Sequence, residues 1–549
     1  MVRCGTGRIR CSITRRPASR NRRIAPRPAV NLHPIDAVVV VLYFAAVLGL
    51  GWRFSRRQGT TERYFLGARN FPGWAVGLSF IGSTISSVTF IAYPADSFKT
   101  AWVRLLPNLA FPFVVTLAGL VFIPFFRSGR IRSAYHYLSL RFGPSVAVYA
   151  AVVYLFAQLV RTATITYLLS VLLASLSGLS TPLCIVGAAG ITALYTVKGG
   201  FEAVVWTDVM QTIVLLTGAL ACIAVIAHAL PGGLGQVLAE ALAAGKISFQ
   251  DLNPRTGLLE PVAAGVSLTE KTALMLVLVG VAQYIAGQLD QDTVQRWCSA
   301  KSAREARKSM IVLGLGALPI WTTFMFLGTC LWVYFQHFPS EVATAVLGGT
   351  RKAEDILPHF IVTVLPPGLA GLVVSAALAA AMGSLSGSIN SSGMVWVNDI
   401  YRLYFARDRD DAHYLRASRR ASLALAVAMA GGAWLLHRSS AATIMEMSII
   451  LLALVGGGIS GAFLFGILTR AGDARSVLVG IGATVAFTLY STLAQAGVVP
   501  RVFSSYYTSI LGNVVMFATC AFAATVLPVK PRDLADLTVW TRRRGGEDL

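Results

Sequence analysis

Apolar runs of membrane-spanning length constrain the fold of this chain more than any other feature. A helix needs roughly 20 apolar residues to cross the hydrocarbon core of a bilayer. Runs near that length or longer recur with short loops between them and predict about thirteen transmembrane helices. They cover residues 36–52, 71–98, 104–126, 145–176, 181–197, 203–230, 268–297, 309–337, 360–398, 419–436, 441–468, 475–494 and 506–528. The predicted fold class is therefore an all-α polytopic membrane protein.

Composition and charge agree with this class. Of 549 residues, 55% are hydrophobic and 13% are charged, with a mean hydropathy of +0.65, which is far from a soluble enzyme. Lysine and arginine number 47 against 25 acidic residues, a net charge of +22. The positive charge lies in loops and in an arginine-rich segment over residues 1–30, without interleaved aromatic-basic motifs, so no nucleic-acid partner is expected. The seven cysteines form no CxxC pair, and no HExxH or GxSxG motif supports an enzyme.

Arginine-rich loops alternate with neutral or mixed loops along the chain. The positive-inside rule makes the arginine-rich set cytoplasmic, and an odd helix count then places the N-terminus outside and the C-terminus inside. The long loop at 231–267 is then external and is expected to carry a short surface helix. We expect a disordered basic tail at 1–33, a transmembrane domain at 34–530 and a cytoplasmic tail at 531–549. The basic tail violates the orientation, so it is either an over-extended translation start or a genuine tail.

A stretch of small polar residues interrupts the second apolar run. Residues 82–89 read Gly-Ser-Thr-Ile-Ser-Ser-Val-Thr. A weak, polar helix segment at mid-depth is costly unless it lines a cavity, and secondary transporters bind ions and solutes at such broken helices. The alternative is a helix-packing face, because small residues also let helices approach closely.

Two ionisable residues lie deep in apolar runs, where charge is expensive and typically functional. Arg161 lies halfway along the run at 145–176, and Asp208 lies about eight residues into its helix, roughly 12 Å from that end. In one interpretation Arg161 and Asp208 simply pair with each other. In the other, Arg161 binds a substrate carboxylate through its planar fork and Asp208 helps to bind a cation.

A second polar cluster covers residues 380–392, within the run at 360–398. Helical spacing puts Ala380 and Ser384 on one stripe, and Gly383, Ser386 and Gly387 on another. Exposed carbonyls and hydroxyls are neutral oxygen ligands of the kind that sodium prefers, although a packing face remains the alternative. A transporter core explains the helix break, the Ser/Gly stripe, the buried acid and the buried arginine together. If each feature served only helix packing, the presence of all four in one chain would be coincidental.

Four motifs in this order carry a resemblance to a known family. They are Tyr64–Arg69, Lys198–Gln211, Asp290–Trp297 followed by Ala300 and Lys301, and the Ser/Gly cluster ending in Asn398–Arg402. With these motifs the chain, over about residues 34–530, resembles the sodium:solute symporter family. The resemblance implies a LeuT-like inverted repeat of five plus five helices, with one extra helix before this core and two after it.

The resemblance also implies where sodium binds. The main site lies between the broken first core helix and the eighth, and maps onto Gly82, Ile85, Ala380, Gly383 and Ser384. Gly383 replaces a residue that usually carries a hydroxyl, so one side-chain ligand is lost. A candidate second sodium site comprises Asp208 and Ser386, where Gly383 and Gly387 depart from the family pattern.

The substrate side resembles one branch of the family. Val88 and Thr89 stand where sugar transporters carry an acid–amide pair, which disfavours a neutral hexose. The implied substrate-binding residues are Thr84, Ser86, Thr89, Asn108 and Arg161, a pattern more similar to the bacterial sialic acid symporters. There the arginine holds the carboxylate and the hydroxyls hold the polar arms of the sugar acid. Monocarboxylate carriers of the family share the Ser-x-Val-Thr pattern.

We therefore predict a sodium-coupled secondary active symporter, and no enzyme, in the cell (inner) membrane. It imports a small carboxylated solute by alternating access, and a sialic acid or related sugar acid is the favoured substrate. A monocarboxylate or a neutral monosaccharide is the first alternative, and a transporter-like sensor is the second. The expected partners are sodium, the solute and the lipid bilayer.

Overall fold

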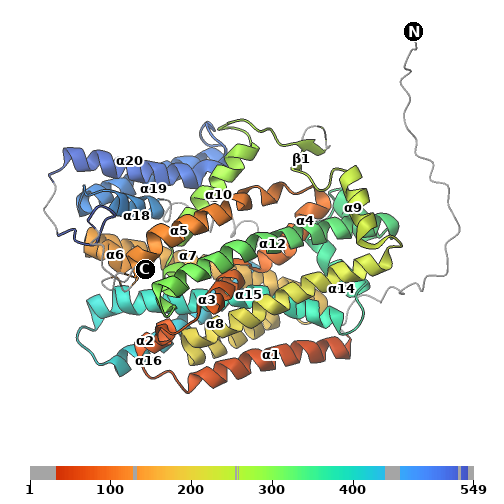
Figure 1. Ribbon diagram of the computed structural model, residues 1–549, viewed down its shortest axis with the longest axis horizontal. Helices are drawn as coiled ribbons and strands as arrows, with labels where there is room; N and C mark the ends of the chain where they lie inside the picture. Colours follow the sequence, from red (N-terminus) through yellow and green to blue (C-terminus); the bar gives the residue numbers. More distant parts are fainter. Residues whose placement is uncertain are drawn as a thin grey trace, which may run out of the picture.

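Long helices that lie side by side form nearly the whole protein (Figure 1). The computed structural model describes residues 33–127, 131, 133–253, 256, 259–438, 458–528 and 533–541. Among these residues, nine helices are long and apolar enough to cross a membrane, or up to eleven if each bent pair is one span. The predicted run at 441–468 is only partly described, because residues 441–457 lie outside the described residues. The basic tail over residues 1–32 also lies outside them.

The second predicted run is broken, as residues 82–89 indicate. Helix α3 (Gly73–Thr84) and helix α4 (Ser87–Lys99) meet at a bend of 60°. Between them Ile85 and Ser86 are extended, with ψ angles of 98° and 176°. The small side chains here do little to shield a helical backbone, and the break exposes peptide groups at the middle of the span.

A second broken span was not predicted. The run expected as one helix at 268–297 is divided into α10 (Ala273–Gln288) and α11 (Gln291–Ser299), bent by 58°. The break falls at Leu289 and Asp290, where a half-buried carboxylate and its polar neighbours interrupt the apolar sequence. The first half, α10, is apolar, whereas α11 carries Asp292, Gln295 and Arg296, so the predicted apolar run extended across a polar helix.

The two runs predicted at 181–197 and 203–230 form one element, α8 (Thr181–Ala229), that is interrupted at Gly200. Gly200 has φ 58° and ψ −158°, a conformation that favours glycine. A Cβ atom there would lie 2.8 Å from the carbonyl oxygen of Tyr64, so the motif around it also permits a close backbone approach.

Helix α15 (Leu369–Val395) forms the centre of the bundle. Most of it is buried, and it packs mainly against α8, with further contacts to α7 (Pro144–Ser177) and α1 (Pro34–Ser55). Its first turn is held by α1, because the Asp36 carboxylate accepts hydrogen bonds from the backbone N–H groups of Gly368 (2.6 Å) and Gly371 (2.8 Å). A buried acid thus satisfies backbone donors that every helix N-terminus leaves unpaired.

The remaining elements complete the bundle and its two ends. The other long helices are α5 (Phe111–Phe126), α12 (Ala303–His337), α16 (Asp411–Arg438), α18 (Ile459–Leu468), α19 (Ala474–Gln495) and α20 (Thr508–Val526). A π-helix, η5 (Trp396–Phe405), continues α15 without a break. The short helices are α2 (Thr61–Leu66), η1 (Gly67–Arg69), η2 (Val103–Leu105), η3 (Pro107–Ala110), α6 (Ala134–Arg141), α9 (Gly233–Ala243), α13 (Glu341–Leu347), η4 (Ala353–Asp355), α14 (Ile356–Thr363) and η6 (Ser505–Tyr507).

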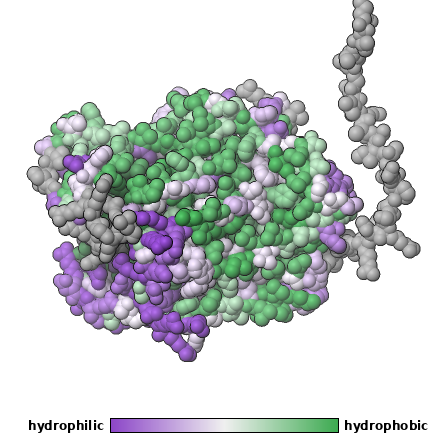
Figure 2. Space-filling model, viewed as in Figure 1, coloured by the Kyte–Doolittle hydropathy of each residue, from purple (hydrophilic) through white to green (hydrophobic). Residues whose placement is uncertain are grey.

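The two ends of the bundle differ in character. The loop at 231–267 carries the surface helix that was predicted, α9, and a small hairpin of β1 (Gln250–Leu252) and β2 (Leu259–Pro261) that was not. These elements and α14 lie at one end of the molecule, while α2, α6 and α16 lie toward the other (Figure 1). Figure 2 shows hydrophobic surface across the body and a hydrophilic patch over the end with α2 and α16. An apolar girdle with a polar end is the surface expected of a multi-pass membrane protein.

Candidate ion and solute site

The break between α3 and α4 lies directly against the Ser/Gly cluster of α15. Ser384 Oγ donates a hydrogen bond to the Ser83 carbonyl oxygen across 2.9 Å. Beside it, a Cβ atom on Gly383 would lie 2.6 Å from the Gly82 carbonyl oxygen. Only a glycine lets the two helices approach so closely, so the residue that removes a hydroxyl from α15 also brings the Gly82 carbonyl to it.

The other two predicted sodium ligands lie in the same region. Ile85 directly follows α3, Ala380 lies one turn before Ser384, and both are buried. The structure thus brings together backbone carbonyls from a helix break and one hydroxyl from a facing helix. Neutral oxygens of this kind suit a hard cation such as sodium.

Asp208 has a buried partner that the sequence did not reveal. Its Oδ2 atom accepts hydrogen bonds from Ser79 Oγ (2.6 Å) and from Arg296 Nη2 (3.1 Å). The pair Arg296 and Asp208 has no exposed side-chain surface. The alternative that Arg161 and Asp208 pair with each other is therefore wrong, because Arg296 on α11 holds this carboxylate.

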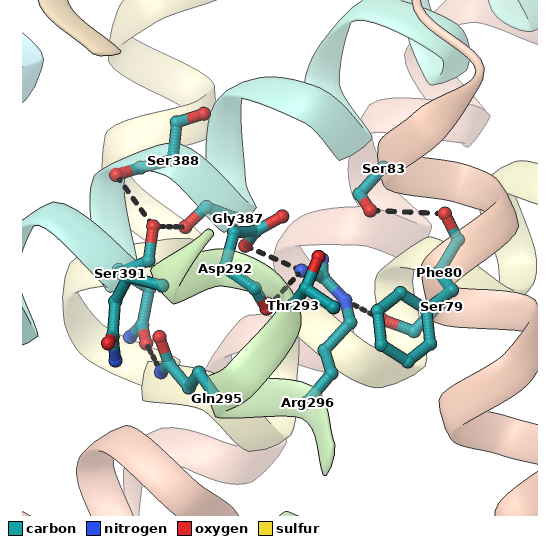
Figure 3. Close-up of polar contacts among 12 residues, drawn as sticks. Ser79, Phe80, Ser83, Asp292, Thr293, Gln295, Arg296, Gly387, Ser388 and Ser391 are labelled. Atoms are coloured by element: carbon teal, nitrogen blue, oxygen red, sulfur yellow. Dashed lines mark hydrogen bonds and ion pairs between the residues drawn. The ribbon is translucent and has the colours of Figure 1, made fainter. Parts of the chain in front are cut away.

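Arg296 lies at the centre of a network that joins three helices (Figure 3). Its Nη1 lies 2.5 Å from Asp292 Oδ1, and its Nε donates to Ser79 Oγ at 3.1 Å. The rings of Phe80 and Phe201 flank the guanidinium, with centroids 5.6 and 5.9 Å from its carbon. Two carboxylates and two aromatic faces hold one positive charge out of water, as a buried guanidinium requires.

The same guanidinium occupies the space beside Gly387. A Cβ atom on Gly387 would lie 2.9 Å from Arg296 Nη2. Ser386, predicted with Asp208 for a second sodium site, donates its hydroxyl to the Gly383 carbonyl of its own helix at 3.1 Å. Arg296 therefore supplies Asp208 with a positive charge, and Ser386 bonds within α15.

Unpaired buried atoms surround this region. Within the described residues, Asp208 Oδ1 and both polar atoms of the Gln211 side chain are buried and have no hydrogen-bond partner. Gln211 Oε1 would lie 3.1 Å from a Cβ atom on Gly383, so it points to the same gap as the Gly82 carbonyl. Buried polar atoms without partners are costly, and their oxygens would suit a cation or water.

Arg161 lies level with the ion-site part of α15. Two bonds set the register of α7 on α15: Tyr154 Oη with Ser391 Oγ (2.7 Å), and Ser388 Oγ to Gln158 Oε1 (2.9 Å). Continuing the register by one turn of α7 brings Arg161 close to the depth of Ser384. Arg161 is exposed in the middle of a 34-residue helix, and its charge acts on Asp290 at the break of α10 and α11.

Three predicted hydroxyls border the first break. Thr84 and Ser86 are half-buried, and Thr89 is buried one turn into α4. The Ser86 hydroxyl makes no capping bond to α4, although Ser86 occupies the N-cap position. The hydroxyls of Thr84 and Ser86 thus lie at the opening of the helix, where a solute could reach them.

Asn108 bridges the two broken spans. Its Nδ2 donates to Tyr93 Oη on α4 (2.8 Å), and its Oδ1 accepts from Tyr284 Oη on α10 (2.7 Å). It is buried, so both ends of its amide are already used. Asn108 was predicted to bind substrate, and the geometry shows a clamp between α4 and α10.

The likeness to known proteins agrees with this arrangement. A model of the sodium:solute symporter family matches residues 64–482, which is more than half of the chain. The chain belongs to the sodium:solute symporter family. This symporter is therefore a sodium-coupled multi-pass membrane transporter rather than an enzyme.

The symporter has relatives of known name. It is 31% identical to the sodium/sialic acid symporter SiaT of Proteus mirabilis, over 81% of this chain and 87% of that protein. It is 28% identical to the sodium/sialic acid symporter NanT of Aliivibrio fischeri, over 84% and 88%. It is 27% identical to human sodium-coupled monocarboxylate transporter 1, over 82% and 71%. A solved Na⁺-coupled sialic acid symporter in a substrate-bound outward-open state superposes with a TM-score of 0.80, at 27% identity, covering 91% of this chain and 99% of that one.

The sequence missed residues that the symporter fold places at the site. Arg296 and Asp292 stand four residues apart in a motif that was noted only as a family signature, although this spacing puts them on one helical face. Gln211 closes another noted motif, and Tyr93 with Tyr284 had no sequence signal at all. A buried charge such as that of Asp208 predicts an oppositely charged partner on another helix, but it does not identify that residue.

Proposed function

We propose that this symporter couples inward sodium flow to the import of a small carboxylated solute, a sialic acid or a related sugar acid. The observation that carries the proposal is Arg161, a guanidinium exposed at mid-helix and close to the depth of the broken α3–α4 span. A planar guanidinium recognises a carboxylate through two parallel hydrogen bonds. The names of the bacterial relatives at 31% and 28% identity support a sugar acid as the substrate.

Sodium would bind where α3 ends against α15. The ligands in the proposal are the carbonyls of Gly82, Ile85 and Ala380 and the hydroxyl of Ser384. The direct bond from Ser384 to Ser83 supports it, because it shows that the two helices already meet at this point. An ion held by both helices stabilises the conformation in which they approach, and this differential binding couples sodium to the solute site.

One sodium ion per cycle is the stoichiometry that we propose. A second sodium at Asp208 and Ser386 would have to compete with the guanidinium of Arg296. This guanidinium is part of the protein and lies 3.1 Å from the Asp208 carboxylate. A tethered cation loses no translational freedom on pairing, so a free ion is at a disadvantage.

The solute would lie between Arg161 and the opening of the first broken span. Arg161 holds the carboxylate, while Thr84, Ser86 and Thr89 offer hydroxyls to its polar groups. In this proposal Asn108 does not contact the solute; instead its amide links Tyr93 on α4 to Tyr284 on α10. Opening and closing of this clamp would admit or enclose the solute.

The chain would act as a LeuT-like inverted repeat in the inner membrane. The domain at 34–530 would place the N-terminus outside and the C-terminus inside, so that α9, the hairpin and α14 face outward. The arginine-rich loops at the opposite end support this orientation through the positive-inside rule.

Uptake into proteoliposomes under an imposed sodium gradient tests the proposal. The competitors to test are sialic acids, uronic acids, short monocarboxylates and neutral sugars. Sugar acids should inhibit uptake most strongly, monocarboxylates less and neutral sugars least. Strong competition by a neutral sugar would contradict a carboxylate site. Solute binding without sodium-driven accumulation would support the alternative of a transporter-like sensor.

A further inference from the structure

A second cavity lies at the far end of the helix that carries the ion site. It has a volume of about 550 Å³ and is bounded by η5, the start of α16 and the corner between α6 and α7. Its lining includes Arg402, Arg407, Asp408, Arg409 and Tyr414. From Ser384 to Arg402 the chain advances 18 residues, roughly 25 Å at about 1.5 Å per residue. The cavity is therefore distinct from the solute site.

The cavity carries an excess of positive charge. Arg402, Arg407 and Arg409 line it against the single carboxylate of Asp408. Among the described residues, none of these three guanidiniums forms an ion pair with a carboxylate. Three unpaired guanidiniums around one opening are suited to a group with several anionic oxygens.

Two of these arginines are held in place by the protein. The guanidinium of Arg402 lies over the Tyr414 ring, 4.1 Å from its centroid. Arg407 donates through Nε to the Leu403 carbonyl at 2.7 Å, which leaves its outer N–H groups for another partner. The Tyr414 hydroxyl in turn donates to the Ala406 carbonyl (2.7 Å) and fixes the loop that follows η5.

Exposed aromatic residues lie on the same element as Arg402, and one of them, Tyr404, lines the cavity. On η5, Phe405 is 71% exposed, Tyr404 51% and Trp396 39%. Trp396 and Phe405 stack with ring centroids 6.5 Å apart, so they form one apolar ledge. Aromatic side chains of this kind gather where a membrane protein crosses the interface between lipid and water.

We propose that this cavity binds the phosphate headgroup of an anionic phospholipid, with the acyl chains along the ledge of Trp396, Tyr404 and Phe405. The arginines account for the phosphate, and basic pockets between helices bind such headgroups. Free phosphate would use the same arginines, but it leaves the exposed Phe405 without a role, and the combination of charge and apolar surface therefore selects a lipid. The lipid would bridge η5, which continues α15, to the corner of α6 and α7, where α7 packs against α15.

Native mass spectrometry of the full chain in detergent tests this site. Titration with phosphatidylglycerol should give one lipid bound well above phosphatidylcholine. Arg407→Gln and Arg409→Gln should each weaken that binding about fivefold. Asp408→Asn should strengthen it, and asparagine suits the positive φ of 54° at this position. Arg420→Gln is the matched control, because Arg420 is exposed on α16 but does not line the cavity.

The outcomes separate the alternatives. Equal binding of phosphatidylcholine, or an equal loss in Arg420→Gln, would overturn the site. Inorganic phosphate and Phe405→Ser separate the two phosphate sources. Phosphate at millimolar concentration should not displace the lipid, and Phe405→Ser should weaken lipid binding. If phosphate displaces the lipid and Phe405→Ser has no effect, the occupant is a free anion and the lipid assignment is wrong. Melting temperatures of all variants exclude unfolding as the cause.

Discussion

Arg296 and Asp208 form an ion pair that lies wholly inside the protein, with 3.1 Å between Nη2 and Oδ2. The pair joins α11, the second half of one broken span, to α8, and Ser79 adds α3 from the other broken span. A buried pair adds little net stability compared with apolar residues, but loss of one partner leaves a buried charge behind. The pair therefore specifies how the two broken spans sit together.

Arg296→Met should destabilise the protein by about 3–5 kcal/mol, because it leaves Asp208 and Asp292 unpaired. Thermal unfolding in detergent measures this loss. Arg351→Met is the matched control, since Arg351 pairs with Asp355 in an exposed bridge at 2.8 Å and should lose less than about 1 kcal/mol. Equal melting temperatures for the two variants would contradict a structural role for Arg296.

Sodium should activate uptake with a Hill coefficient near one. Because the tethered guanidinium of Arg296 already neutralises Asp208, we expect the ion to bind at Ser384 rather than at Asp208. The measurement is initial uptake rate against sodium concentration at saturating solute. A Hill coefficient near two would refute the single-ion stoichiometry and revive the site at Asp208 and Ser386.

Ser384→Ala should raise the half-saturating sodium concentration about tenfold, since it removes one oxygen that would face a cation. Solute affinity at saturating sodium should change little. Ser375→Ala serves as the control, because Ser375 lies on the same helix and bonds only to the Gly371 carbonyl at 2.9 Å. A similar sodium dependence in both variants would show that Ser384 is not a ligand.

Arg161→Ala should reduce uptake of a carboxylated solute by about a hundredfold, the effect of removing one partner of a desolvated charge pair. Arg161→Lys should retain part of the uptake, because it keeps the charge but loses the planar fork. Competition with a neutral analogue of the same solute should be unaffected by either change. Uptake of the acid that survives in Arg161→Ala would end the carboxylate hypothesis.

Lys246 should make stability depend on pH. Its ammonium donates to the carbonyls of Phe98 (2.8 Å) and Thr100 (2.7 Å) and lies over Trp332, and burial lowers its pKa from 10.5 to about 7. Between about pH 7 and pH 10.5 the unfolded chain binds more protons at this group, so its contribution to stability rises with pH in that window. Lys246→Met should flatten the rise in melting temperature between pH 7 and pH 10. If the slope of melting temperature against pH is unchanged in Lys246→Met, Lys246 is not the cause of the pH dependence.

The sequence predicted the elements better than their contacts. Apolar length located most of the described spans, although the runs at 181–197 and 203–230 form the single interrupted element α8. Residues 82–89 located the first break, because backbone exposure and polarity are local properties. The break at Asp290 was missed, since the polar residues from Gln288 to Asp292 resemble those at the end of a helix. The surface helix α9 was expected, whereas the three-residue strands beside it are too short to leave a periodic signal.

The site was predicted as a set of residues rather than as a network. Gly82, Gly383 and Ser384 do meet, because two helices with small residues at matching depth can approach closely. The partner of Asp208 depends on how α11 folds back after the second break. The sequence alone does not predict how close Arg296 on α11 comes to Asp208 on α8. Asn108 was assigned to substrate through the family resemblance, yet Tyr93 and Tyr284 use both ends of its amide.

The two hydrogen bonds from Gly368 and Gly371 to Asp36 have a mechanical consequence. In the proposed inverted repeat, α1 would lie outside the core and would ordinarily be regarded as a passive flank. Because the Asp36 carboxylate on α1 caps the N-terminus of α15, we expect the two helices to move together. If α15 moves during transport, we expect α1 to move with it and to displace the lipids along its outer face.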